Sequence, residues 1–275
     1  MNRQLEEKLE RLESHLASLG SAVVAYSGGV DSAFLAVAAH RALGARMIAV
    51  LGHSPSLAQK EWNDACKISE RFGFPMEKVV THELENPLYQ SNTPDRCYHC
   101  KDELFQILKT WAAEKGFQTV LDGTNKDDLG DYRPGRRAGE KHGIRSPLID
   151  CGWTKEEIRQ VSLALGIPIW DKPASPCLAS RFPTGEPIRL EALRWVEKAE
   201  TALRSLGFLE QRVRVHGEMA RIELSLGEMP RMLEPGIRAA VIQSLHEAGF
   251  RRIVLDLEGY RSSGEGWSKN AEELP

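Results

Sequence analysis

Residues 22–32 of this chain read Ala-Val-Val-Ala-Tyr-Ser-Gly-Gly-Val-Asp-Ser, and this stretch decides the fold. The apolar run at residues 22–26 predicts a buried strand, and residues 31–43 have the pattern of a helix that Gly44 would end. Between them, glycines let backbone N–H groups approach an anion, and the helix N-terminus adds unsatisfied donors and a positive dipole. A tight turn with a capping serine is the plainer interpretation, but the complete strand–loop–helix string favours a phosphate-binding loop.

Strands and helices alternate around this loop. Leucines at helical spacing predict a helix over residues 3–19, and further elements follow at regular intervals. The later strands are predicted at residues 47–51, 78–81 and 119–122, and the later helices at residues 57–72 and 101–115. Such alternation is typical of an α/β fold with a doubly wound parallel sheet, which binds ligands beyond the carboxyl ends of its strands.

Three polar segments interrupt the alternation, and long insertions of this kind are often functional loops. They are residues 86–100, 127–145 and 170–187. The third is rich in proline, and beyond it the pattern changes to a helix, two strands of alternating polarity, a helix and a last strand. We therefore expect a nucleotide-binding domain at residues 1–185 and a small α+β domain at residues 186–275.

The bulk composition argues against several classes of protein. The 275 residues carry a formal net charge of -3, so no basic excess indicates binding to nucleic acid. No run is long and apolar enough to span a bilayer, and the N-terminus has the pattern of a charged amphipathic helix rather than a signal peptide. We expect a cytoplasmic protein that binds a small molecule and has no membrane or nucleic-acid partner.

Five cysteines, an odd number, argue against a disulfide framework in such a chain. Cys97 and Cys100 form a C-x-x-C, which suits a redox pair, half of a metal site or a coincidence. With Cys177 they would leave one position of an iron–sulfur cluster open, where an exogenous sulfide could bind. Alternatively, the cation of Arg181 would favour a Cys177 thiolate that attacks an acyl-adenylate. The other two thiols are expected to be structural: Cys66 and Cys151.

The string at residues 27–32 lacks the lysine of a Walker A loop and resembles the PP-loop of the ATP-pyrophosphatase superfamily. Members split ATP into AMP and pyrophosphate by adenylating a substrate. The resemblance implies that the loop holds pyrophosphate and that Asp31 is a catalytic residue organising the phosphates around Mg²⁺. Residues 121–125 resemble a second nucleotide-side motif of the superfamily. The ATP-binding residues expected on this basis are Ser27, Gly28, Gly29, Val30, Asp31, Ser32, His53, Thr124 and Asn125.

Four further segments together resemble the LarE family of ATP-dependent sulfur transferases, over roughly residues 15–262. They are DRCYHCKDELF (95–105), LDGTNKDDLGDYRPGRRA (121–138), KPASPCLASRFPTGEPI (172–188) and RVRVHGEMARIEL (212–224). The resemblance implies adenylation of a carboxylate of pyridinium-3,5-biscarboxylic acid mononucleotide and its conversion to a thiocarboxylate in nickel-pincer nucleotide cofactor biosynthesis. In one variant of the family a cysteine matching Cys177 gives up its sulfur. In the other, favoured here, cysteines matching Cys97, Cys100 and Cys177 hold a [4Fe–4S] cluster that carries the sulfide.

The resemblance also implies contacts with the substrate. Arg212 and Arg214 are two apart on a predicted strand and point to one face, where guanidinium groups suit phosphate or carboxylate, although a solvated sheet face is the plainer interpretation. Ser180 and Arg181 are expected to hold the nucleotide, with Lys101 as a weaker candidate for neutralising phosphate. tRNA thiolation, amidation and a non-catalytic nucleotide sensor are the alternatives. We expect a homo-oligomer by analogy with GMP synthetase.

Overall fold

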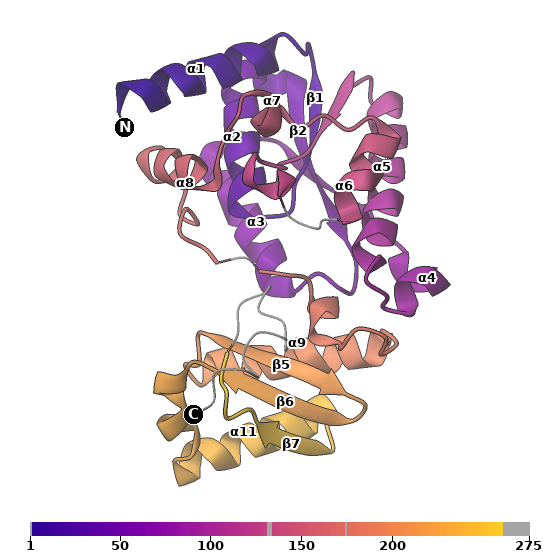
Figure 1. The fold of residues 1–275 in the computed structure, drawn as a ribbon, viewed down its shortest axis with the longest axis vertical. Coiled ribbons are helices and arrows are strands. Elements are labelled where there is room, and N and C mark those ends of the chain that lie inside the picture. The colour runs from indigo at the N-terminus through magenta and orange to yellow at the C-terminus, as the bar shows by residue number, and fades with distance from the viewer. Residues whose placement is uncertain (1, 131–133, 174, 261–275) are drawn as a thin grey trace. The chain divides into compact units, whose positions relative to one another are not determined.

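The computed structural model of the chain describes residues 2–130, 134–173 and 175–260 (Figure 1). None of the helices in these ranges combines the length and the apolar character that crossing a membrane requires.

Internal contacts divide the chain into two compact units. Unit 1 is made of Met1–Tyr89 and Pro94–Ser175, and unit 2 is made of Gln90–Thr93 and Pro176–Pro275. The polypeptide therefore enters unit 2 briefly between two elements of unit 1. The boundary expected between residues 185 and 186 stays a prediction about domains.

A four-stranded parallel sheet forms the centre of unit 1 and confirms the expected α/β class. Its strand order is β3-β2-β1-β4, with β1 in the interior. The bounds of the strands are β1 Ala22–Ala25, β2 Met47–His53, β3 Met76–Val80 and β4 Thr119–Leu121. Since all four strands run in the same direction, the segments that follow β1, β2 and β4 leave the sheet at one edge.

Helices cover both faces of this sheet (Figure 1). The helices of residues 3–164 are α1 Arg3–Ala17, α2 Val30–Leu43, α3 Gln59–Phe72, α4 Pro87–Gln90, α5 Arg96–Glu114, α6 Pro134–His142, α7 Pro147–Asp150 and α8 Lys155–Ala164. Short 3-10 turns are η1 Gly44–Arg46, η2 Glu83–Glu85 and η3 Asp127–Leu129.

The alternation of side chains along β1 assigns the helices to the two faces. Ala22 and Val24 belong to a buried cluster with the apolar residues of α1, α2, α3 and α8. Val23, between them, packs instead with residues of α5 and α6, including Phe105 and Ala138. Because neighbouring strand residues point to opposite faces, a strand buried on both sides has to be apolar throughout, as the run at residues 22–25 is.

Two helices of unit 1 differ from the sequence-based expectation. Helix α5 begins at Arg96, five residues before the predicted start, so the C-x-x-C lies in the first turns of a helix and not in a loop. Helix α6 occupies part of the segment predicted as a polar loop. Its sequence, PGRRAGEKH, has two glycines and a low intrinsic helix propensity, and packing of its small residues against α5 stabilises it instead.

Unit 2 is a small α+β unit. Its sheet has the order β5-β6-β7, with an antiparallel β5–β6 pair and a parallel β6–β7 pair. The elements are η4 Leu178–Arg181, α9 Leu190–Ser205, β5 Gln211–His216, β6 Met219–Leu224, η5 Leu226–Glu228, α10 Met229–Met232, α11 Pro235–Ala248 and β7 Arg252–Leu255.

The short segment Gln90–Thr93 is held within unit 2 by hydrogen bonds. The carbonyl oxygens of Gln90 and Asn92 accept from the backbone of Ile188 (2.9 Å) and Gly185 (2.9 Å). Asn92 Nδ2 also donates to Pro183 O at 2.7 Å. Asn92 is buried and has a φ of 51°, the left-handed region that asparagine tolerates better than most residues.

Candidate functional site

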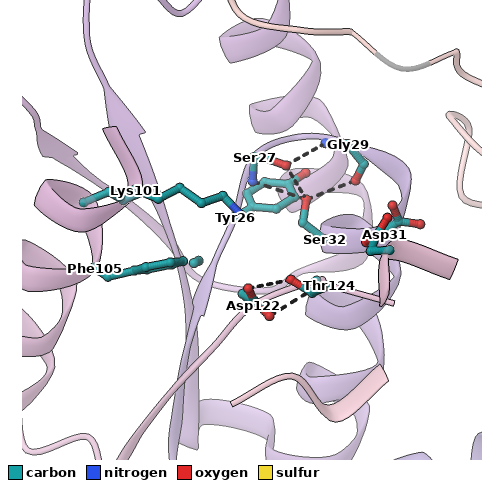
Figure 2. A pocket seen from close by; sticks show the side chains of 13 residues that line it. Tyr26, Ser27, Gly29, Asp31, Ser32, Lys101, Phe105, Asp122 and Thr124 are labelled. Atoms are coloured by element: carbon teal, nitrogen blue, oxygen red, sulfur yellow. Dashed lines mark hydrogen bonds between the residues drawn. The ribbon is translucent and has the colours of Figure 1, made fainter. Parts of the chain in front are cut away.

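The loop between β1 and α2 is built for close approach to an anion. Gly28 has a φ of 72°, and a Cβ atom there would lie 3.3 Å from Ala65 Cβ, so both the conformation and the space favour glycine. The N-cap of α2 is Gly29, whose carbonyl accepts from Ser32 Oγ at 3.1 Å. Ser27 Oγ lies 3.0 Å from Ser32 Oγ, so the two hydroxyls meet over the start of the helix (Figure 2).

The segment after β4 completes this site from the neighbouring strand. A Cβ atom on Gly123 would lie 2.9 Å from Ser32 N, so only glycine lets this segment approach the start of α2 so closely. Asp122 accepts from Thr124 Oγ1 at 2.7 Å and from Ser146 Oγ at 2.6 Å. These bonds fix the turn at the strand end, with Asp122 and Thr124 facing the loop (Figure 2).

A pocket lies between these two strand ends and α5. The residues that line it are Ala25, Tyr26, Ser27, Gly29, Asp31, Ser32, Lys101, Leu104, Phe105, Asp122, Gly123, Thr124 and Asp128. Five of the expected ATP-binding residues are among them: Ser27, Gly29, Asp31, Ser32 and Thr124. Lys101, expected near the substrate, enters the same pocket from α5 and extends toward Tyr26 (Figure 2).

The other expected ATP-binding residues do not line this pocket. Gly28 lies in the loop with a positive φ, and Val30 is the first residue of α2. The ring of His53 packs edge-on against Trp62, with ring centres 5.4 Å apart. Asn125 is fully buried, and its Oδ1 accepts from the backbone N–H groups of the next turn, Asp127 at 2.9 Å and Asp128 at 3.3 Å. Contact of His53 and Asn125 with ATP stays a prediction.

Asp31 projects from the first turn of α2, and its two carboxylate oxygens have different surroundings. Oδ2 accepts from Lys155 Nζ at 2.9 Å. Oδ1 is buried and has no hydrogen-bond partner among the described residues. A carboxylate oxygen in this position beside a phosphate-binding loop suits Mg²⁺, which prefers one or two carboxylates together with phosphate oxygens.

Lys155 is a candidate residue that the sequence-based analysis missed. It is the first residue of α8, where Thr154 forms a capping box with Glu157. The backbone N–H of Lys155 donates to Asp127 Oδ2 at 2.8 Å, which ties α8 to the segment after β4. The capping box is a local signal for the helix, but nothing local in the sequence relates Lys155 to Asp31.

The cysteines of the C-x-x-C lie on α5 in unit 1. Cys97 is exposed and Cys100 is half-buried, and their spacing of three residues puts both thiols on one face of the helix. This arrangement fits two ligands of an iron–sulfur cluster. Cys177 is exposed and belongs to unit 2. Within residues 2–130, 134–173 and 175–260, no three His, Cys, Asp or Glu are grouped to hold a metal ion, so the three-cysteine cluster stays a prediction.

The surroundings of the other two thiols raise their pKa values. Burial, and after it the carboxylate of Glu70, raises the pKa of Cys66. Burial, and after it Asp150, raises the pKa of Cys151. Both are half-buried, in line with the structural role expected for them.

Arg181 organises the segment around Cys177. Its guanidinium is buried and binds the Glu200 carboxylate through two bonds, Nε–Oε1 at 2.8 Å and Nη2–Oε2 at 3.1 Å. Its Nη1 donates to Pro176 O and to Ser180 Oγ, both at 2.9 Å. Burial alone would lower the pKa of Arg181, but the Glu200 carboxylate more than offsets it and raises the pKa. The arginine therefore fixes the residues on both sides of Cys177.

The two arginines of β5 lie on the sheet face opposite the buried Val213. Arg212 is buried and lies over the Tyr260 ring, 4.8 Å from its centre. Arg214 donates to Glu223 Oε1 at 2.9 Å and to Ser180 O at 2.8 Å. Burial, with the nearby cations of Arg181 and Arg214, lowers the pKa of Arg212. Arg214 therefore joins the Cys177 segment to the sheet of unit 2, and contact of either arginine with a substrate stays a prediction.

Comparison with known proteins covers nearly the whole chain. The family model described as NAD synthase matches residues 4–106. An uncharacterized protein of Synechocystis is 45% identical over 94% of this chain and 96% of its own length. The pyridinium-3,5-bisthiocarboxylic acid mononucleotide synthase of Lactiplantibacillus plantarum is 36% identical over 94% of this chain and 93% of its own. A glutamine-hydrolysing GMP synthase component from Archaeoglobus fulgidus is 30% identical over 54% of this chain and 52% of its own.

Proposed function

The chain belongs to the LarE family of pyridinium-3,5-bisthiocarboxylic acid mononucleotide synthases, and from this premise we propose that it is an ATP-dependent sulfur transferase. The proposed substrate is pyridinium-3,5-biscarboxylic acid mononucleotide, of which one carboxylate becomes a thiocarboxylate. The single observation that carries the proposal is the meeting of the PP-loop hydroxyls, Asp31 and Lys101 in one pocket of a chain so closely related to that synthase.

The first step is adenylation. An oxygen of the substrate carboxylate attacks the α-phosphorus of ATP, the bond between α- and β-phosphates breaks, and pyrophosphate leaves. The backbone at Gly28 and Gly29 and the hydroxyls of Ser27 and Ser32 bind the departing pyrophosphate. Mg²⁺ on Asp31 Oδ1 would neutralise phosphate charge.

The substrate itself is an anion, and unit 2 offers cations for it. Burial is the largest cause of the lowered pKa of Arg212, and repulsion from the cations of Arg181 and Arg214 lowers it further. An anionic ligand would offset this repulsion. Arg181 is already bound to Glu200 and to its own segment, so we assign it the role of positioning Cys177. Arg212 and Arg214 are proposed to bind the phosphate or the second carboxylate.

The second step replaces AMP by sulfur at the acyl carbon. A [4Fe–4S] cluster held by Cys97, Cys100 and Cys177 would supply a sulfide from its open iron. In the second route the Cys177 thiolate attacks the acyl carbon, AMP leaves, and β-elimination releases the thiocarboxylate and leaves dehydroalanine. Cys177 is required in both routes, and Cys97 and Cys100 are required only in the first.

The test is anaerobic incubation with ATP, Mg²⁺, sulfide and the dicarboxylate mononucleotide, before and after reconstitution with iron. AMP, pyrophosphate and thiocarboxylate in equal amounts over many turnovers, lost in Cys97→Ala and Cys177→Ala but retained in Cys66→Ala, would support the cluster route. A single turnover in which Cys177 loses the mass of hydrogen sulfide would support the sacrificial route. Absence of pyrophosphate release would overturn the proposed function.

A further inference from the structure

Lys101 reaches the nucleotide pocket from α5, on the side away from the phosphate-binding loop. Its stem runs from α5 toward Tyr26, and its ammonium lies 5.6 Å from the centre of the Phe105 ring, one turn further along α5 (Figure 2). Both residues line the pocket. A lysine stem that lies along apolar surface with its ammonium at a polar opening is a favourable arrangement, and the aromatic face adds attraction for the cation.

Charged side chains near Lys101 form ion pairs, whereas Lys101 itself has no ion-pair partner within residues 2–130, 134–173 and 175–260. Asp102 accepts from Lys141 Nζ at 2.7 Å and from His142 Nε2 at 2.8 Å. Arg137 lies over the Tyr98 ring and 3.7 Å from Asp95. In the described part of the chain no carboxylate lies within ion-pair distance of Lys101 Nζ. Its cation is therefore not needed to hold α5 to α6, and an anion in the pocket is the partner it lacks.

A glycine of α6 leaves the space in which the Lys101 stem lies. A Cβ atom added at Gly135 would lie 2.5 Å from Lys101 Cδ and 3.2 Å from both Cγ and Cε. Contacts below 3.0 Å require something to move, and the lysine stem is the movable partner. Gly135 has an ordinary helical backbone, so neither a positive φ nor a turn accounts for its lack of a side chain.

The second glycine of α6 is a natural comparison. A Cβ atom on Gly139 would lie 3.7 Å from Phe105 Cε2 and 3.9 Å from Ile144 Cβ, which are ordinary contacts. Both glycines are buried in the same nine-residue helix and face α5. Glycine weakens a helix relative to alanine, and only at Gly135 does the structure offer a geometric reason to tolerate that weakness.

We propose that Gly135 is a positioning residue for ATP use: by leaving the channel along α5 open, it keeps Lys101 extended into the pocket, where the ammonium binds the phosphate chain of ATP. This inference rests on the proposed ATP-dependent function, and it gives α6 a part in positioning a residue that binds ATP. The ligand class of Lys101 is an oligophosphate, because the same pocket presents the glycine loop and the hydroxyls of Ser27 and Ser32.

The experiment is a double-mutant cycle on the full-length protein with the matched control. Gly135→Ala, Lys101→Ala, the double variant and Gly139→Ala are compared for binding of Mg²⁺–ATP by calorimetry and for pyrophosphate formation. We expect Gly135→Ala to lower the rate of pyrophosphate formation about 10- to 100-fold, the loss that a displacement of about 1 Å can cause. Gly139→Ala should change it less than about twofold, and Gly135→Ala should add less than about twofold to Lys101→Ala.

Two results would overturn the proposal. One is equal loss in Gly135→Ala and Gly139→Ala, which would mean a general effect on α6. The other is an undiminished effect of Gly135→Ala when Lys101 is already alanine. Should Gly135→Ala fail to fold, Lys101→Met tests whether the ammonium of Lys101 binds ATP, because methionine keeps an unbranched stem without the cation. Full activity of Lys101→Met would also overturn the proposal. Calorimetry of ATP binding needs no acceptor substrate. If Gly135→Ala and Lys101→Ala weaken ATP binding in the coupled way expected while the parent enzyme forms no thiocarboxylate, the proposed sulfur transfer is refuted and the role of Gly135 is not.

Discussion

Lys155 and Asp31 form an ion pair across 124 residues of sequence, with Lys155 Nζ 2.9 Å from Asp31 Oδ2. The pair joins the first turn of α2 to the first turn of α8. It occupies one carboxylate oxygen and leaves the other, Oδ1, buried and without a hydrogen-bond partner among the described residues. The lysine therefore fixes the orientation of the Asp31 carboxylate, and Oδ1 is the oxygen that we propose for a metal ion.

The first prediction concerns this pair. In Lys155→Ala the Asp31 carboxylate is released to rotate, so we expect pyrophosphate formation to fall about 10²-fold and the Mg²⁺ concentration for half-maximal rate to rise. Lys155→Arg should recover part of the loss, because it keeps a cation at the same position. Lys60→Ala, which breaks an exposed i,i+4 pair with Asp64 on α3, is the control. A Lys155→Ala enzyme with the parent rate would show that the pair is incidental to catalysis.

The second prediction concerns the stability of unit 2. Glu200 is buried, accepts from Arg181 through both oxygens and accepts from Val213 N at 3.2 Å. Glu200→Ala leaves the Arg181 cation buried without its partner, and we expect it to lower the free energy of unfolding by about 3–5 kcal/mol. Urea unfolding measures the change. Lys198→Ala, on the exposed side of α9, should lie within about 0.5 kcal/mol of the parent, and a comparable value for Glu200→Ala would refute the assignment.

The third prediction concerns thiol reactivity. Because burial raises the pKa of Cys66 and Cys151, these residues carry little thiolate at neutral pH. Cys97 and Cys177 are exposed. In the protein without iron, iodoacetamide should therefore modify Cys97 and Cys177 first, and peptide mapping by mass spectrometry would read the order. Early modification of Cys66 or Cys151 would contradict it. Their modification should accelerate as the pH rises through the alkaline range.

The fourth prediction is a pH dependence at the contact between α5 and α6. Burial tends to raise the pKa of Asp102, but hydrogen bonds from Lys141 and His142 more than offset it and hold the pKa below its ordinary value of 3.8. A carboxyl with a lowered folded-state pKa stabilises the fold above its unfolded pKa, and the contribution disappears as the pH falls through the folded value. The unfolding free energies of the parent and Asp102→Asn should therefore differ near pH 6 and converge below about pH 3.8. A constant difference would exclude this carboxylate as its source.

At the loop of residues 27–32, local sequence was enough to predict which side chains lie together, and their contact with ATP stays a prediction. The loop at residues 27–32 follows from an apolar strand, two glycines and a helix start, and the structure brings Ser27, Asp31 and Ser32 to one pocket as expected. Lys155 could not be related to Asp31 in this way, because only the folding of the sheet brings together residues so far apart.

Helix α6 illustrates a second reason why prediction from the sequence differed from the structure. Glycine and proline in PGRRAGEKH indicate a loop by intrinsic propensity, yet the small side chains let the segment pack as a helix against α5. Packing between elements outweighs propensity here, and a single sequence does not display that packing. The early start of α5 has the same origin, since Asp95 at its N-cap makes no capping bond with its side chain.

The excursion of Gln90–Thr93 into unit 2 has a consequence for biosynthesis. Ile188 and Gly185 donate to the carbonyls of Gln90 and Asn92, residues that leave the ribosome more than ninety positions earlier. During translation these carbonyls cannot accept from Ile188 and Gly185 until α5, β4 and α8 have been synthesised. Unit 2 cannot finish folding until the chain beyond Pro176 has been synthesised, and a fragment that begins at Pro176 would lack these two carbonyl acceptors. Such long-range closure is slow to form, so the late stage of folding is where we expect this chain to depend most on chaperones.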